Sequence, residues 1–459
     1  MRFYSEPIPE HEEVPLADGG ELEHLIETWS ERDATGEEAE AGAERLVYVL
    51  SVSWERDPLI REAQLSEMLS LVEAQGDCVV GYECYTLTKA RPRTLIGKGT
   101  AQAVADRARE CGATMLVLDA ELTPSQTRNL EDEAGIKICD REAVILNVFL
   151  RHASTRRARI QVEIAQLEYL RPRIRGVGIN MDQQMGGVAG SRGPGETASE
   201  LLARQLDGRL AELRKASRKI EKGDDNRRKR RDNCLSVALV GYTNAGKTSL
   251  MNALTRGDFS SADRPFETLD TVSRSLSRHG ETVVLSDTVG FIRRLPERLL
   301  ASFESTLAEA REANLLAIVV DLSDYEWEAH LDTTVEVLEK LAADGIPRHY
   351  VFNKMDLVDL VPSRDKLEEL TEGHGFSLVS SRESESVEQL KESLLRAVRV
   401  DQRECTLVVP YQATEVLNLI YAGCRVKETT SSEHGLTLQV EGRNSVLERI
   451  EKKLAEVLV

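Results

Sequence analysis

The chain has 459 residues, of which 41% are hydrophobic and 30% charged, and its formal net charge at pH 7 is −19. This composition is typical of a soluble globular protein, and the length predicts about three or four domains. No apolar stretch is long enough to span a membrane, and the first 30 residues are acidic. We therefore expect neither a membrane anchor nor a signal peptide and place the protein in the cytoplasm. The seven cysteines are scattered without metal-ligand spacing, as expected of reduced thiols.

The charge is distributed unevenly along the chain. Residues 1–45 hold 14 acidic and 3 basic residues without sustained periodicity, which predicts an acidic, disordered tail. Residues 151–231 hold 20 basic and 10 acidic residues. A concentrated basic segment in an acidic protein indicates contact with a polyanion, because neutralising phosphates releases counterions. The alternative interpretation is a solvated helical face.

Residues 46–150 alternate between strand and helix patterns. We expect strands over 46–52, 78–88, 114–119 and 136–139, and helices over 59–74, 100–111 and 123–133. This alternation predicts a small α/β domain with a parallel sheet. The glycines of the turn at residues 95–99 fit either an anion site or a tight strand-to-helix connection.

The next two helical patterns cover residues 141–170 and 198–222. A glycine-rich connection over 176–196 joins them, which predicts an antiparallel hairpin with a long tip. Arg192 in the connection, together with Arg171, Arg173 and Arg175 beside it, favours contact with a polyanion. Residues 223–233 read as a basic linker.

The segment Gly241–Leu250 lies between an apolar strand pattern and a helix pattern, and its sequence is G-x-x-x-x-G-K-T followed by serine. This is the context of a phosphate-binding loop, in which backbone N–H groups and a helix N-terminus face the phosphates. Lys247 would reach the β- and γ-phosphates, and the Thr248 hydroxyl would bind Mg²⁺. The residues assigned to nucleotide binding here are Gly241, Tyr242, Thr243, Asn244, Ala245, Gly246, Lys247, Thr248 and Ser249.

Further strands are expected over 282–287, 315–321, 349–353 and 376–381, which completes a doubly wound nucleotide-binding domain. Asp287 stands at a strand end, where it would act on Mg²⁺ through water, and the Gly290 N–H would sense the γ-phosphate. Thr268 is the candidate switch threonine that closes on the metal. We therefore assign metal binding to Thr248, Thr268 and Asp287, and catalysis to Lys247, Thr268 and Gly290.

The base is predicted by Asn353-Lys354-x-Asp356, which also follows a strand. A carboxylate at Asp356 accepts from both N1–H and the N2 amino group of guanine, whereas adenine would leave it unpaired. Asn353 would read the opposite edge, Lys354 would pack over the ring, and the Ser380 and Ser381 backbone would support O6. The nucleotide is therefore predicted to be GTP.

Two residues bear on the rate of hydrolysis. Many GTPases place a glutamine directly after the switch glycine to orient water, and this chain has Phe291, so we expect slow intrinsic turnover. Asn244 either helps to hold a monovalent cation such as K⁺ beside the β- and γ-phosphates or only braces the loop. Residues 401–459 form a small domain with strand patterns at 405–409 and 436–440, helix patterns at 413–423 and 445–458, and no visible chemistry.

Over roughly residues 46–459 the sequence resembles the HflX family, within the Obg–HflX group of translation-factor-related P-loop GTPases. The hydrophobic residue after the switch glycine is typical of this group, whereas Thr271 stands where the family often has proline. The segments that carry the resemblance are Gly241–Lys247, Phe266–Asp270, Asp287–Ile292, Asn353–Asp356, Pro124–Glu131, Asp140–Arg141, Gln161–Leu167 and Arg192–Glu196.

The resemblance implies a GTPase that binds the large ribosomal subunit, with the hairpin and its glycine-rich connection reaching ribosomal RNA. Bacterial relatives dissociate stalled or idle ribosomes. We thus expect a cytoplasmic, monomeric, Mg²⁺-dependent GTPase that binds GTP and GDP. The alternatives are an RNA-binding or chaperone module in which GTP only regulates occupancy, and an RNA-modification or assembly GTPase. The expected divisions are a tail (1–45), an α/β domain (46–150), the hairpin with its linker (151–232), the GTPase domain (233–400) and a C-terminal α/β domain (401–459).

Overall fold

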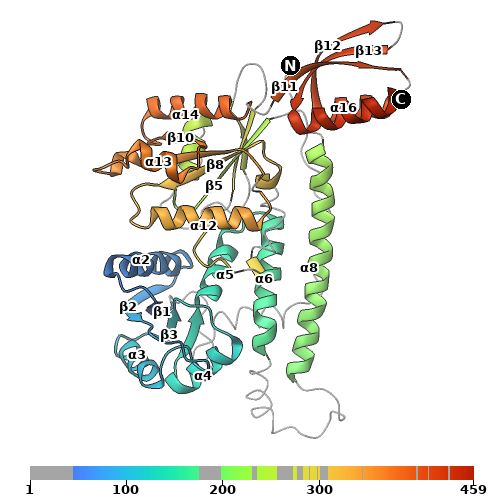
Figure 1. The fold of residues 1–459 in the computed structure, drawn as a ribbon. Coiled ribbons are helices and arrows are strands. Elements are labelled where there is room, and N and C mark those ends of the chain that lie inside the picture. The colour runs from blue at the N-terminus through green and yellow to red at the C-terminus, as the bar shows by residue number, and fades with distance from the viewer. Residues whose placement is uncertain are drawn as a thin grey trace.

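The computed structural model describes residues 45–174, 198–229, 235–255, 272–276, 283–288, 290–296, 298–299, 309–343, 345–399, 402–411, 413–432 and 435–458. The predictions for the acidic tail, the glycine-rich connection at 176–196 and Thr268 lie outside these residues. An N-terminal sheet and a larger central sheet lie next to each other, with a long helical hairpin alongside and a small C-terminal domain beyond (Figure 1).

The N-terminal sheet is parallel throughout, as predicted, in the order β2-β1-β3-β4. Its helices start at residues that the sequence marks. Asp57 caps α2 ahead of Pro58, and Thr123 and Gln126 form a capping box at the start of α4. The bounds of these elements are β1 Leu46–Ser53, α2 Pro58–Ala74, β2 Cys78–Thr86, α3 Lys98–Glu110, β3 Met115–Leu118, α4 Pro124–Ala134 and β4 Lys137–Asp140.

The stretch predicted to be helical over 141–170 is interrupted once, so that two helices occupy it: α5 (Arg141–His152) and α6 (Arg156–Ile174). The backbone becomes extended at Ala153, which ends α5. The Thr155 hydroxyl then accepts a hydrogen bond from the Ala158 N–H at 3.1 Å. A side-chain hydroxyl that satisfies a free N–H at a helix start is an N-cap, so Thr155 restarts the helix.

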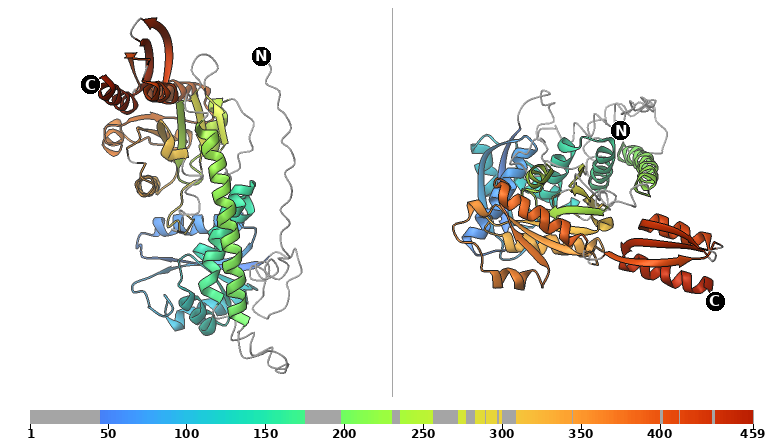
Figure 2. Two further views of the ribbon diagram at one scale, coloured as in Figure 1. Left: turned by 90° about the vertical axis from the view of Figure 1, so that its right-hand side faces the viewer. Right: turned by 90° about the horizontal axis from the view of Figure 1, so that it is seen from above.

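Helix α8 (Ala198–Lys229) packs alongside α6 as the predicted hairpin (Figure 2). The pairs Arg209–Glu163 at 2.7 Å and Arg171–Asp207 run in opposite directions along the two helices, so the hairpin is antiparallel. The helix continues through Lys229, so the linker predicted from residue 223 begins too early. The apolar seam between the helices consists of Ile160, Ile164, Leu167, Leu206, Leu210 and Leu213.

The central sheet has the order β10-β9-β8-β5-β7-β6 and is parallel except for the edge strand β6, which is antiparallel to β7. The doubly wound prediction is confirmed, although β6 was not expected from its short and polar sequence. The bounds are β5 Leu235–Gly241, α9 Lys247–Thr255, β6 Val272–Ser275, β7 Val283–Asp287, β8 Leu315–Asp321, α12 Trp327–Lys340, β9 Arg348–Asn353, η1 Met355–Leu357, α13 Arg364–Leu370, β10 Gly375–Leu378 and α14 Ser384–Ala397.

The C-terminal domain is an antiparallel sheet, β11-β13-β12, covered by two helices, and it projects from the rest of the molecule (Figure 2). Strand β12 was not predicted, because its sequence is mostly charged and hydroxylated. Across the described ranges, no helix has the length and apolarity needed to cross a membrane. The bounds are β11 Gln402–Val409, α15 Thr414–Gly423, β12 Cys424–Ser432, β13 Gly435–Arg443 and α16 Asn444–Leu458.

One buried apolar cluster joins the N-terminal domain to the central domain. It includes Met68 of α2 and Phe149 of α5 on one side, and Phe291, Ile292 and Leu331 on the other. Figure 1 shows α2 and α5 lying beneath α12, which covers one face of the central sheet. Because interiors are close-packed, a displacement of the segment at 291–292 is transmitted to the N-terminal domain.

Candidate functional site

The loop between β5 and α9 has the backbone of a phosphate cradle. Gly246 has φ +87°, and Asn244 also adopts the left-handed region at φ 59°, which asparagine tolerates better than most residues. The Asn244 side chain is exposed and makes no hydrogen bond within the described part of the chain, so the geometry gives no support to a bracing role. The loop therefore turns so that α9 begins at Lys247 and points its N-terminus at the cradle.

The Lys247 ammonium lies inside this cradle. It donates to the Gly241 carbonyl at 3.1 Å and to the Tyr242 carbonyl at 2.8 Å. Burial lowers the pKa of Lys247 to about 8, against the opposing effect of the Asp287 carboxylate. A phosphate group beside the ammonium would restore the charged form.

Two oxygen groups meet at the end of β7, where the Thr248 hydroxyl donates to Asp287 Oδ2 at 2.8 Å. Asp287 is only 1% exposed. Next to it, the Thr288 hydroxyl donates to the Leu239 carbonyl at 2.7 Å, which fixes the strand end against β5. A hydroxyl and a carboxylate form the hard-oxygen donor set that Mg²⁺ prefers, so these residues fit that ion.

The predicted base-reading motif Asn353–Asp356 lies at the end of β9. Asn353 is fully buried, and its Nδ2 donates to the Ala245 carbonyl of the phosphate loop at 2.9 Å. Lys354 forms an ion pair with Asp321 at 2.6 Å. The Asp356 side chain is 24% exposed at the start of the next turn. The structure thus ties the end of β9 to the phosphate loop, and the Asp356 carboxylate lies 3.8 Å from the Arg382 guanidinium.

A second loop approaches the same place. The Ser380 N–H donates to Ser386 Oγ at 3.2 Å, and the Val379 carbonyl accepts from Met355 N–H at 3.3 Å. The Ser380 N–H is therefore already occupied by a hydrogen bond within its own loop. For the Ser381 N–H, no acceptor is found among the described residues.

Comparison with known proteins gives matches along the chain. Family models described as "GTP-binding GTPase N-terminal", "GTP-binding GTPase Middle Region" and "50S ribosome-binding GTPase" match residues 62–150, 152–231 and 236–354. The GTPase HflX of Gluconacetobacter diazotrophicus is 38% identical over 86% of this chain and 87% of its own. The chain belongs to the HflX family of GTPases.

Other HflX relatives match to a similar extent. GTPase HflX of Spirochaeta thermophila is 41% identical over 76% of this chain and 85% of its own, and that of Escherichia coli is 34% identical over 82% and 89%. A crystal structure of a GTP-binding protein from Sulfolobus solfataricus in complex with GDP is 23% identical, with a TM-score of 0.42 over 77% of this chain and 98% of that one. As an HflX GTPase, the protein binds GTP and GDP and hydrolyses GTP.

The structure corrects the expectation for the arginines beside the glycine-rich connection. Arg173 does not face outward for a polyanion: its guanidinium lies over the Tyr169 ring and pairs with Asp140 at 3.0 Å, with a side chain only 8% exposed. Arg171 remains at the surface but is paired with Asp207. Phe291 is buried in the shared apolar cluster. That it does not orient the attacking water stays a prediction.

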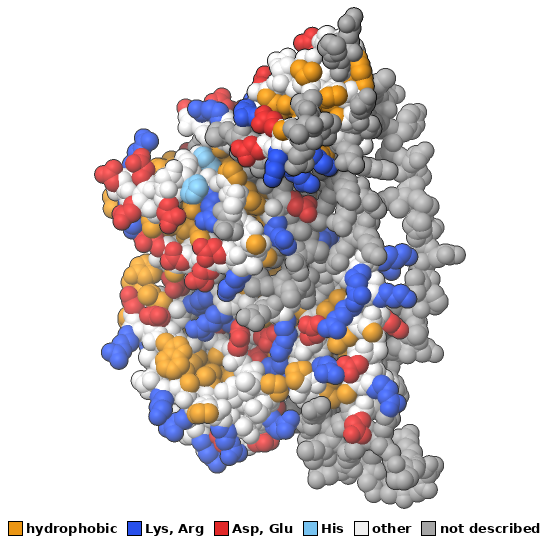
Figure 3. All heavy atoms as spheres, turned by 45° about the vertical axis from the view of Figure 1, so that its right-hand side comes forward, with side chains coloured by type: hydrophobic (Ala, Val, Ile, Leu, Met, Phe, Trp, Pro, Cys, Tyr) orange, Lys and Arg blue, Asp and Glu red, His pale blue; other side chains and the backbone are white. Residues whose placement is uncertain are grey.

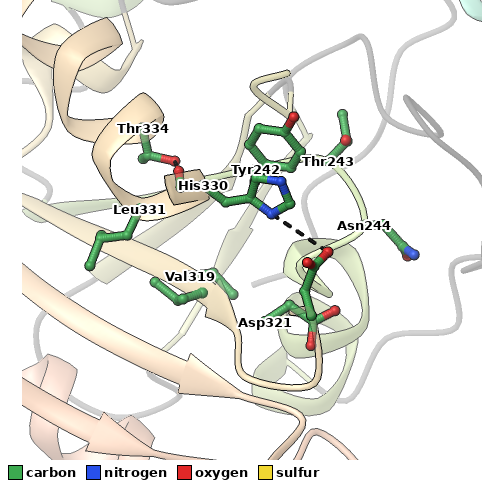
Figure 4. A pocket seen from close by; sticks show the side chains of 10 residues that line it. Tyr242, Thr243, Asn244, Val319, Asp321, His330, Leu331 and Thr334 are labelled. Carbon is green, nitrogen blue, oxygen red and sulfur yellow. Dashed lines mark hydrogen bonds and ion pairs between the residues drawn. The ribbon is translucent and has the colours of Figure 1, made fainter. Parts of the chain in front are cut away.

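A pocket opens beside the phosphate loop between Tyr242 and α12 (Figure 4). The Tyr242 ring stacks on His330, with ring centroids 3.7 Å apart and planes 9° from parallel. His330 Nδ1 lies 3.5 Å from Asp324 Oδ2. Burial lowers the pKa of His330, although Asp324 opposes this effect. The HflX motif contains the tyrosine, but nothing local in the sequence indicates its stacking partner.

Proposed function

We propose that this HflX GTPase binds the large ribosomal subunit in its GTP state and leaves it after hydrolysis. The observation that carries the proposal is a row of exposed cations on α8, at Lys215, Arg218 and Lys219. No ion pair is found for them within the described residues, and their spacing places them on one helix face. In Figure 3, basic side chains gather over the hairpin. The matched family description, "50S ribosome-binding GTPase", supports the same partner.

In the proposed site, Lys247 contacts the β- and γ-phosphates and the Gly290 N–H contacts the γ-phosphate. Thr248 would hold Mg²⁺ directly and Asp287 would act on it through water, and the ion would supply positive charge that neutralises the phosphate oxygens. Thr268 would close on the metal in the GTP state. Because Phe291 cannot orient water, intrinsic turnover is slow. The remaining loop residues, Gly241, Tyr242, Thr243, Asn244, Ala245, Gly246 and Ser249, form the cradle.

On the base side, the Asp356 carboxylate accepts from guanine N1–H and N2–H, and Asn353 contacts the opposite edge. Lys354 packs over the ring. With the Ser380 N–H already bonded to Ser386, the Ser381 N–H is the stronger choice as the donor to O6. The Asn244 side chain makes no hydrogen bond to the residues that the structure describes, which supports the proposal that it helps to hold K⁺ beside the phosphates.

The protein acts as a monomer in the cytoplasm, where its partner lies. The division into domains at residues 45/46, 150/151, 232/233 and 400/401 stays a prediction. The GTPase domain would signal nucleotide state, and the basic hairpin would contact ribosomal RNA.

The test measures GTP turnover with and without purified large subunits, at matched KCl and NaCl concentrations. We expect subunits to stimulate turnover in KCl and Asn244→Ala to lose the preference for KCl. The double variant Lys215→Ala/Lys219→Ala should weaken subunit binding and reduce its salt slope by about 2, one for each phosphate that is no longer neutralised. The matched control, Arg364→Ala/Lys366→Ala, removes two exposed cations from α13 and should leave binding unchanged. Two results together would favour the RNA-binding alternative. GTP turnover would not change when large subunits are added, and the protein would bind free structured RNA tightly in every nucleotide state.

A further inference from the structure

A hydrogen-bonded network connects the phosphate loop to the N-terminal domain. The Tyr242 hydroxyl donates to Glu67 of α2 and accepts from the Arg293 backbone N–H at 2.7 Å. Stacking on His330 fixes the tyrosine ring from the side (Figure 4). One side chain of the phosphate loop thus contacts both the N-terminal domain and the segment that follows Gly290.

The carbonyl of the same residue, Arg293, is held by Arg141. The Arg141 side chain has no exposed surface and lies between Glu67 and Asp119, with Arg141 Nη1 2.6 Å from Asp119 Oδ1. Its Nη2 also donates to the Arg293 carbonyl at 3.0 Å. Burial raises the pKa of Glu67, but Arg141 and Arg293 outweigh it and hold that pKa below its ordinary value, so Glu67 is a carboxylate at neutral pH. The backbone N–H and carbonyl of Arg293 are therefore both fixed by a charge-balanced, buried network.

Between Gly290 and Arg293, the backbone is hydrogen-bonded to the phosphate loop. The Phe291 N–H donates to the Gly241 carbonyl at 3.0 Å, and the Thr243 N–H donates to the Phe291 carbonyl at 2.7 Å. Gly290 itself lies against the loop: a Cβ placed on it would be 2.9 Å from the Thr243 Cα. Continuous contacts therefore connect the N-terminal domain to the backbone at Gly290.

We propose that Glu67 and Arg141 are positioning residues for GTP hydrolysis, fixing Gly290 through the Tyr242 hydroxyl and the Arg293 backbone. This inference rests on the role proposed above for Gly290. Pre-set backbone donors stabilise developing charge without reorganising, and a displacement of about 1 Å is enough to slow a reaction severely. The N-terminal domain thereby becomes part of the catalytic geometry of the GTPase site without touching the nucleotide.

The test compares single-turnover and steady-state GTP hydrolysis by the full chain carrying Tyr242→Phe, Glu67→Gln or both. Tyr242→Phe is the milder change, because it keeps the ring and its stacking and removes only the hydroxyl. Each variant should lower kcat at least about fivefold, with KM and GDP affinity changing less than about threefold. The double variant should be little slower than the slower single one, because both break the same connection.

The control is Asp77→Asn, which disrupts a buried ion pair with Arg45 inside the N-terminal domain, at 3.0 Å, away from the phosphate loop. It should leave kcat unchanged. An unchanged or raised kcat in Tyr242→Phe, or an equal loss in the control, overturns the positioning role. Gly290→Ala separates the two proposals. If it hydrolyses GTP normally, the role of Gly290 fails; if it is slow while Tyr242→Phe is normal, only the positioning inference fails.

Discussion

Gly246→Ala tests how closely the phosphate loop is fitted to the end of β9. A Cβ on Gly246 would lie 2.3 Å from Asn353 Nδ2, and the residue has φ +87°. The left-handed backbone costs an alanine about 1–2 kcal/mol. The clash would also displace the fully buried Asn353 amide from the Ala245 carbonyl, which costs about 1–3 kcal/mol more. We expect the free energy of unfolding to fall by about 2–5 kcal/mol.

The chain offers a matched control for this substitution. Gly373 has φ +80° and nothing within 4 Å of the added Cβ, so Gly373→Ala carries only the backbone cost of about 1–2 kcal/mol. Urea unfolding measures both losses, and calorimetry measures GDP affinity. Because we propose that Asn353 also reads the base, Gly246→Ala should weaken GDP binding at least about tenfold. Gly373→Ala should leave GDP binding unchanged. Equal stability losses with unchanged GDP affinity in both variants would refute the reasoning.

Three further predictions concern pH and base specificity. GDP binding at pH 8.5 should take up about 0.8 proton and at pH 7 about 0.1, since Lys247 has a pKa of about 8 before phosphates recharge it; calorimetry in buffers of different ionisation enthalpy measures this, and buffer-independent heats would contradict it. Burial lowers the pKa of His349 to about 4, so the unfolded chain binds more protons between pH 6.5 and 4 and stability falls as pH falls through that window, by about 3 kcal/mol in total. His349→Gln should flatten that part of a urea-unfolding pH series, and an unchanged slope would count against the assignment. Asp356→Asn should weaken GDP binding about 10- to 100-fold and favour xanthosine diphosphate, whose C2 oxygen accepts from the new amide, as competition binding would reveal; undiminished GDP affinity would argue against the base assignment.

The nucleotide motifs were predictable because their chemistry lies at the carboxyl ends of parallel strands. Apolar runs such as Leu315–Asp321 mark these strands, and the residues after them meet at one edge of the sheet. The helix starts at Pro58 and Pro124 were predictable for a similar reason, since capping depends on neighbours in sequence. Local sequence patterns were therefore enough to predict most of the fold.

What the sequence did not reveal depends on contacts between distant residues. Strands β6 and β12 are short or polar and form because a neighbouring strand supplies their hydrogen bonds. Tyr242 and Glu67 are 175 positions apart, so no local spacing connects them. One available signal was Arg141, a cation two residues before the apolar run Ala143–Leu146, where burial would require a partner to neutralise it.

The measurement that tests the central claim most directly is co-sedimentation of the protein with purified large ribosomal subunits. It compares a non-hydrolysable GTP analogue, GDP and no nucleotide. We expect pelleting with the analogue, little with GDP, and none for Lys247→Ala in any of the three nucleotide states. Equal pelleting in all three nucleotide states, or none in any, would contradict a ribosome-binding cycle controlled by GTP.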